Sequence, residues 1–168
     1  MKNIVLIGMI GCGKTTVGTL LARDTGRELA DTDALIEQRT GLSIPEIFAR
    51  HGEAYFRDEE LGLAEELALR RGLVIACGGG LPLRPGSIGS LKHSGTVFWL
   101  RRDPGETYDS LDRSGRPLAQ GGRDGFLARF AQREPIYRAW ADHTVSAPSA
   151  RAAADAILEI LSREEQQS

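Results

Sequence analysis

The chain has 168 residues, 41% of them hydrophobic and 26% charged, which is the length and composition of a single globular domain. Its formal net charge of -2 at pH 7 and its aromatic content of 6% argue against nucleic-acid and membrane partners, which call for strongly basic or base-stacking surfaces. Its two cysteines are too few for a disulfide scaffold and favour a reducing cytoplasm.

Apolar runs alternate with helical patterns along the chain. Strands are expected at residues 3–7, 28–30, 73–77, 96–100 and 144–146, and helices at 14–26, 43–52, 54–71, 104–111, 126–140 and 150–161. Such an alternation predicts an α/β fold with a parallel sheet. One domain is expected over 1–163, with a mobile loop at the polar, glycine- and arginine-rich stretch 112–125 and a frayed end at 164–168.

The strongest motif lies between the first expected strand and the first expected helix. Residues 8–15 read GMIGCGKT and satisfy the pattern G-x-x-x-x-G-K-[ST]. Glycines let backbone N–H groups turn toward phosphate oxygens, and the following helix N-terminus adds partial positive charge. Lys14 would reach the outer phosphates, and Thr15 would supply a hydroxyl to Mg²⁺. The residues expected to bind ATP here are Gly11, Cys12, Gly13, Lys14, Thr15 and Thr16.

Two alternatives accompany this motif. One is that residues 8–15 form the glycine-rich turn between strand and helix of another nucleotide-binding fold. Cys12 fits the loop as a small residue better than as a nucleophile.

Asp31 and Asp33 follow the second expected strand. An open α/β sheet binds its ligands at the carboxyl ends of its strands, so both carboxylates are expected to face the phosphate-binding loop. One can hold the water shell of the metal while the other orients an acceptor hydroxyl and receives its proton. The structural alternative is that one of them caps a helix beginning at Ala34.

Three consecutive glycines, 78–80, follow the third expected strand. Their bare N–H groups could hold a substrate hydroxyl or carboxylate, although many such triplets form only a tight turn. Arg57 and Arg133 lie in expected helices, and each taken alone would be a solvated helix arginine.

In combination, these segments resemble the shikimate kinase family of P-loop small-molecule kinases. The matching pieces, in family order over about residues 3–140, are the loop 8–15, the DTD segment 31–33, GEAYFR at 52–57, the triplet 78–80, RPL at 116–118, and Arg133 with Pro135 and Tyr137. The resemblance implies the P-loop kinase fold, a five-stranded parallel sheet sandwiched between helices, with a mobile lid at about 112–125.

The resemblance also implies site roles. Arg57 and Arg133 would bind the carboxylate of shikimate, Asp33 would engage its ring hydroxyls, and Gly79 would add backbone contacts. The implied catalytic residues are Lys14, Asp33 and Arg116, the last reaching the nucleotide from the lid. Thr15 would ligate Mg²⁺ directly and Asp31 would hold it through water. Arginine forks suit a planar carboxylate, in agreement with these roles.

Two segments depart from the family pattern. Only two residues separate Arg113 from Arg116, so the expected lid is shorter than is usual in the family. Whether Arg113 contacts adenine therefore stays open. The loop 146–151 after the last expected strand matches the adenine side of the family only loosely, which leaves base selectivity open.

The function expected from these observations is ATP-dependent phosphorylation of a shikimate hydroxyl, giving shikimate 3-phosphate and ADP in a monomeric cytoplasmic enzyme. A kinase for another polyol acid, such as gluconate, is the nearest alternative, because that substrate also offers hydroxyls and a carboxylate. A non-catalytic nucleotide-binding module is the alternative of a different class, and it would have no use for an acceptor pocket built on Asp33, Arg57 and Arg133.

Overall fold

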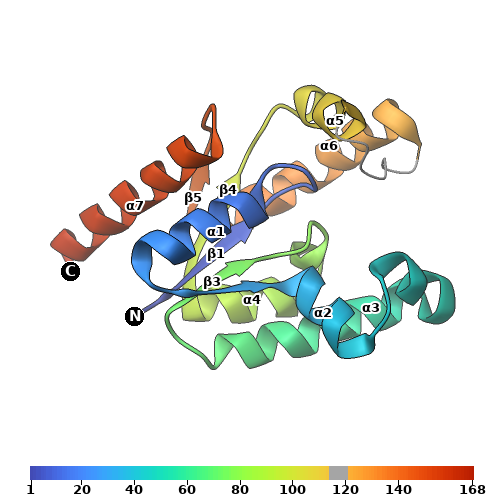
Figure 1. Cartoon of the computed structure of the whole chain (residues 1–168), viewed down its shortest axis with the longest axis horizontal. Helices are drawn as coiled ribbons and strands as arrows, with labels where there is room; N and C mark the ends of the chain where they lie inside the picture. Colours follow the sequence, from blue (N-terminus) through green and yellow to red (C-terminus); the bar gives the residue numbers. More distant parts are fainter. Residues whose placement is uncertain (114–120) are drawn as a thin grey trace.

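The centre of the molecule is a parallel β-sheet. The computed structural model describes residues 1–113 and 121–168, and within these ranges the sheet has five strands in the order β2-β3-β1-β4-β5 (Figure 1). The strands are β1 Asn3–Ile7, β2 Glu28–Asp31, β3 Leu73–Ala76, β4 Gly95–Leu100 and β5 His143–Val145. All four neighbouring pairs are parallel, so the carboxyl ends of all five strands meet at one edge of the sheet.

Helices cover both faces of the sheet. They are α1 Lys14–Thr25, α2 Thr32–Thr40, α3 Ile44–Ala68, α4 Pro85–Ser94, α5 Pro104–Arg113, α6 Gly122–Trp140 and α7 Ala150–Gln167, with a short 3-10 turn at Leu81–Leu83. The sheet lies between α1 on one side and α4 on the other, and α1 contacts α7 while α3 contacts α4 (Figure 1). This arrangement confirms the expected α/β sandwich.

The burial of β1 explains why its sequence is a continuous apolar run. Every residue of this strand is buried. Ile4 and Leu6 pack into the core layer formed with α1 and α7, whereas Val5 and Ile7 pack into the layer formed with α3, α4 and α6. A strand covered on both faces needs apolar residues at every position rather than at alternate ones.

Two helices are absent from the set expected from sequence, although α2 corresponds to the helix that one aspartate was to cap in the structural alternative. α2 buries only Thr32 and Ile36, so it has almost no apolar periodicity to detect. α4, with the sequence PGSIGSLKHS, carries two glycines and three serines, which have low helix propensity. Its packing against α3 stabilises a helix that its sequence does not favour.

Other boundaries differ from those expected. The helices expected at 43–52 and 54–71 are joined in α3, but the expected break is present, because Gly52 has a non-helical backbone (φ 85°, ψ 170°) that kinks the element; α3 ends at Ala68 rather than at residue 71. At the two ends of the loop expected at 112–125, α5 continues through Arg113 and α6 begins at Gly122, while residues 114–120 lie outside the described residues. The expected frayed end is helical through Gln167, and Glu164 hydrogen bonds to His143 of β5 (2.6 Å). In the part of the chain that the structure describes, no helix is long and apolar enough to cross a bilayer.

Candidate active site

The carboxyl edge of the sheet surrounds a cavity of about 610 Å³. The loop after β1, the end of β2 and the glycine triplet after β3 contribute to its wall, and α3 and α6 add side chains. Its lining includes ten of the residues predicted from the sequence, namely Gly11, Gly13, Lys14, Thr15, Thr16, Asp31, Asp33, Arg57, Gly79 and Arg133. Ligand sites of open α/β sheets occur at this edge, so the topology itself explains why these distant residues meet.

The loop between β1 and α1 wraps around the N-terminus of that helix. Gly11 and Gly13 have φ values of 80° and 97°, a left-handed conformation that side chains disfavour. Gly13 is the N-cap of α1 and offers no side-chain oxygen, so the first helical N–H groups lack a side-chain cap. Lys14 Nζ donates to the carbonyls of Gly8 (2.6 Å) and Met9 (2.9 Å), which holds the ammonium across the loop. The result is a concentration of N–H dipoles and positive charge suited to phosphate.

Asp31 joins β2 to the phosphate-binding loop. Its Oδ2 accepts a hydrogen bond from the hydroxyl of Thr15 (2.8 Å), and its Oδ1 accepts one from the N–H of Ala34 (3.1 Å). The second contact caps α2, so the structural alternative for one aspartate is correct. Because the N–H of Ala34 binds only Oδ1, Oδ2 stays free to bind Thr15, and the cap holds the carboxylate in the orientation that allows this contact.

Asp33 is placed differently from Asp31. Its Oδ1 is buried and has no hydrogen-bond partner among the described residues. Burial, followed by the negative charge of Asp31, raises its pKa, while Lys14 and Arg57 oppose that shift. A β-carbon on Gly78 would overlap the Asp33 carboxylate, so the first glycine of the triplet allows this close approach. A carboxylate with a raised pKa in a cavity is suited to accept a proton.

Arg57 is oriented by a residue that the sequence analysis did not identify. Its Nη1 donates to Glu60 Oε1 at 2.5 Å, and the Glu60 side chain is only 1% exposed. Burial raises the pKa of Glu60 to about 7, although Arg57 opposes the shift. A β-carbon on Gly80 would overlap the guanidinium of Arg57, so the last glycine of the triplet leaves room for it.

Arg133 enters the cavity from α6. One turn later in the same helix, the hydroxyl of the buried Tyr137 donates to the carbonyl of Gly79 at 2.6 Å. The N–H of Gly78 donates to the buried hydroxyl of Thr32 (2.9 Å). The glycine triplet is therefore anchored from both α2 and α6.

The buried Glu60 predicts a pH dependence of stability. Its pKa is raised from 4.5 to about 7 in the folded chain, so between these pH values the folded state holds a proton that the unfolded state has released. The free energy of unfolding should therefore fall as pH rises through this window, on the order of 3 kcal/mol for this group. Asp33, whose pKa is also raised, acts in the same direction. Urea denaturation of wild type and Glu60→Gln between about pH 5 and pH 8 checks this.

The comparison uses the difference between the two proteins, since other carboxylates titrate in both. Glu60→Gln should gain stability relative to wild type as pH rises. A constant difference across the window would contradict the assignment to Glu60.

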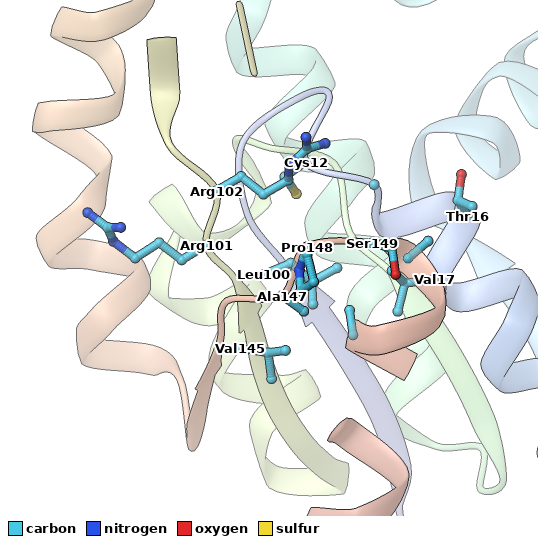
Figure 2. A pocket seen from close by; sticks show the side chains of 13 residues that line it. Cys12, Thr16, Val17, Leu100, Arg101, Arg102, Val145, Ala147, Pro148 and Ser149 are labelled. Atoms are coloured by element: carbon cyan, nitrogen blue, oxygen red, sulfur yellow. The ribbon is translucent and has the colours of Figure 1, made fainter. Parts of the chain in front are cut away.

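A second cavity, of about 190 Å³, lies on the other side of the phosphate-binding loop at the carboxyl ends of β4 and β5 (Figure 2). Gly13 and Thr16 line both cavities, so the two cavities adjoin the N-terminus of α1. Cys12, also predicted to bind nucleotide, lines the second cavity rather than the first. It is buried, with its sulfur 3.7 Å from Lys14 Nζ.

One predicted site residue has no described position, and three residues that shape the site had no predicted role. Arg116, predicted to act from the lid, is outside the described residues. Glu60, Thr32 and Tyr137 were not assigned a role, although each shapes the site. The spacing of Glu60 three residues after Arg57 was a usable signal, because residues three apart on a helix are neighbours.

Comparison with known proteins agrees with this geometry. The family model described as shikimate kinase matches residues 10–163. The chain is 44% identical over 156 residues to the shikimate kinase of Moorella thermoacetica, covering 90% of this chain and 88% of that protein. It is also similar to the solved structure of shikimate kinase from Acinetobacter baumannii in complex with shikimate, with a TM-score of 0.91, 36% identity and coverage of 98% and 94%.

The chain is also similar to the structure of a kinase named for gluconate, the alternative substrate. A gluconokinase from Sinorhizobium meliloti matches with a TM-score of 0.60 and 16% identity, covering 99% of this chain and 97% of the other. At that identity the likeness extends to the fold alone.

Proposed function

Because the chain belongs to the shikimate kinase family, we propose that the cavity at the ends of β1, β2 and β3 holds shikimate beside the terminal phosphate of ATP. The activity is the ATP-dependent phosphorylation of a shikimate hydroxyl, which yields shikimate 3-phosphate and ADP. The single observation that carries the placement is that Asp33, Arg57 and Arg133 line the same cavity as the phosphate-binding loop.

The acid group of the substrate is assigned to the two arginines. Arg57 and Arg133 come from different helices, and a guanidinium fork matches a planar carboxylate in a bidentate way. Gly79 contributes backbone contacts, and the hydrogen bond from Tyr137 keeps that backbone in place. The related enzyme from Acinetobacter baumannii was solved in complex with shikimate, which supports shikimate as the ligand of this cavity.

The chemical step is assigned to Asp33 and Lys14. Asp33 holds the acceptor hydroxyl and takes its proton as the oxygen bonds to the terminal phosphorus and the bond from phosphorus to the ADP oxygen breaks. Its raised pKa suits this role. Lys14 stabilises the negative charge that redistributes over the phosphate oxygens. Arg116 is proposed to add positive charge there.

The site also suits Mg²⁺. This ion is usually held by one or two carboxylates together with substrate phosphates and water. The residues that the structure describes contain no group of three or more histidine, cysteine, aspartate or glutamate side chains that could hold a metal alone, which fits such shared ligation. Thr15 and Asp31, hydrogen-bonded to each other at 2.8 Å, would hold the ion directly and through water. When bound, it neutralises charge on the phosphates.

The base of the nucleotide is assigned to the second cavity. Gly13 and Thr16 line both cavities, so a triphosphate bound at the N-terminus of α1 can extend from one to the other. We also propose a monomer in the cytoplasm, because described residues of one chain line both cavities and the chain has only two cysteines.

The assignment is tested by ADP release. Shikimate should stimulate ADP formation from ATP and Mg²⁺ strongly, whereas gluconate and nucleoside monophosphates should not, because gluconate has no ring to hold its hydroxyls and nucleoside monophosphates have no carboxylate for the two arginines of the cavity. Equal stimulation by gluconate would contradict the placement of shikimate.

Conservative substitution of the arginines gives a further prediction. Arg57→Lys and Arg133→Lys keep the charge but lose the bidentate fork, so each should raise the shikimate KM by about tenfold to 100-fold, with little change in the ATP KM. Steady-state kinetics with each substrate varied in turn measures both constants.

Arg138→Lys is the matched control. Arg138 lies on the same helix as Arg133 but is exposed and pairs with Glu134 (2.8 Å), so its replacement should leave both constants unchanged. A defect confined to ATP in Arg57→Lys and Arg133→Lys would disprove their role in acid binding.

A further inference from the structure

The second cavity is small. Its volume of about 190 Å³ is smaller than the roughly 300–1,000 Å³ of pockets for drug-sized ligands. Val17, Leu100 and Val145 contribute apolar surface from α1, β4 and β5, and Pro148 lies above them in the loop after β5 (Figure 2).

Two consecutive arginines follow β4, and their side chains diverge (Figure 2). The guanidinium carbon of Arg101 lies 5.9 Å from the centroid of the Trp99 ring and 5.7 Å from that of Phe130. Its Nη2 lies 3.9 Å from Oε1 of Glu134. Arg102 extends toward Cys12, is exposed, and forms no hydrogen bond or ion pair with any described residue. Of the two guanidinium groups, that of Arg102 is therefore available to a ligand in this cavity.

The side chains around the cavity are poor readers of a base edge. Selective pairing needs polar atoms side by side, such as the donor and acceptor of an amide or the two acceptors of a carboxylate. Among the described residues that line the cavity there is no aspartate, glutamate, asparagine or glutamine. The Ser149 hydroxyl already accepts a hydrogen bond from the N–H of Ala152 (3.1 Å) as the cap of α7.

A small cavity that combines apolar side chains with one unpaired guanidinium suits the face of a ring better than its edge. Arginine stacks on aromatic faces through its planar, delocalised charge, and every base offers such a face. Adenine and guanine share their fused ring system and differ only at their edges. A site that reads the face cannot separate them strongly.

We propose that Arg102 stacks on the base of the phosphoryl donor and that the donor site accepts purine nucleoside triphosphates without reading their edge, so that GTP serves as well as ATP. The proposal rests on the proposed placement of the nucleotide. With GTP the same step occurs: the shikimate oxygen bonds to the terminal phosphorus, the bond to GDP breaks, and the hydroxyl proton passes to Asp33.

The first test compares the donors. With saturating shikimate and Mg²⁺, kcat/KM for GTP should lie within about tenfold of that for ATP. Pockets that discriminate by shape alone reach about 10- to 200-fold, whereas pockets that pair with a polar edge reach about 10⁴- to 10⁵-fold. A preference for ATP beyond about 1,000-fold would overturn the proposal and show that backbone groups of the loop read the edge.

The second test isolates Arg102 by equilibrium binding of ADP, GDP and inorganic tripolyphosphate. Arg102→Ala should raise the dissociation constants of ADP and GDP by a similar factor of about tenfold and leave that of tripolyphosphate unchanged, since only the base stacks. Arg102→Lys should resemble Arg102→Ala, because it keeps the charge without the plane. Arg23→Ala, an exposed arginine on α1, is the control and should change none of them.

The remaining outcomes are also decisive. Equal weakening of tripolyphosphate by Arg102→Ala would assign Arg102 to the phosphates, and unchanged ADP binding would remove it from the site, so either result overturns the proposal. Failure of the proposed function is distinguishable, because it would appear as a wild-type protein in which shikimate stimulates release of neither ADP from ATP nor GDP from GTP. The binding measurements need no turnover.

Discussion

Lys14→Ala should abolish turnover, lowering kcat by about 1,000-fold or more. The ammonium is the only described lysine side chain in the cavity, and removing one preorganised electrostatic contact to a developing charge costs about 10²- to 10³-fold in kcat. Lys14 also donates to the carbonyls of Gly8 and Met9, so its loss affects the shape of the loop in addition to its charge. Coupled measurement of ADP formation with saturating shikimate and ATP gives kcat directly.

Two further variants separate chemistry from folding. Lys14→Met keeps most of the aliphatic stem and should be as inactive as Lys14→Ala, while its thermal midpoint stays close to that of wild type. Lys2→Ala, which removes an exposed lysine outside the cavity, should retain full activity. Wild-type rates in either Lys14 variant would show that the loop does not act on the phosphates as proposed.

Asp33→Asn should lower kcat by about 10²- to 10⁴-fold, the range in which a positioned general base contributes. The amide keeps the size of the carboxylate but cannot accept the hydroxyl proton. Shikimate binding should weaken as well, because the substrate hydroxyl loses a charged acceptor. Kinetics at varied shikimate concentration, with equilibrium binding of shikimate, measures both effects.

Asp31→Asn is the matched comparison and should have a different effect. Its carboxylate is hydrogen-bonded to Thr15 and to the N–H of Ala34 rather than left without a partner, so its replacement should mainly raise the Mg²⁺ concentration needed for half-maximal rate. Titration of both variants with metal and with shikimate separates the roles. A shikimate defect in Asp31→Asn together with a metal defect in Asp33→Asn would reverse the assignment.

The site shows where sequence reasoning works. The segment 8–15 was interpretable because phosphate binding by a loop depends on backbone geometry, and that geometry depends on glycines at fixed spacing. The position of Asp31 at the end of a strand was equally local information. The pairing of Arg57 with Glu60 could have been predicted from sequence, because the two residues are three positions apart on one helix.

Other parts of the site were beyond that reach. The hydrogen bond from Tyr137 to Gly79 joins residues 58 positions apart. The raised pKa values of Asp33 and Glu60 arise from burial, which depends on the whole surrounding structure. Arg101 and Arg102 are identical neighbours in sequence, and contacts of Arg101 with Trp99, and with Phe130 and Glu134 of the distant α6, make them different in the structure.

The sequence by itself determined the class of fold and the family, because strand burial, helix periodicity and the phosphate-binding motif are each written within a few neighbouring residues. Tertiary structure decided the rest. It formed α4 from a sequence poor in helix-favouring residues, placed Asp33 where Oδ1 has no described partner, and left the guanidinium of Arg102 beside the second cavity. These features depend on burial and on contacts between distant segments, which no local pattern specifies.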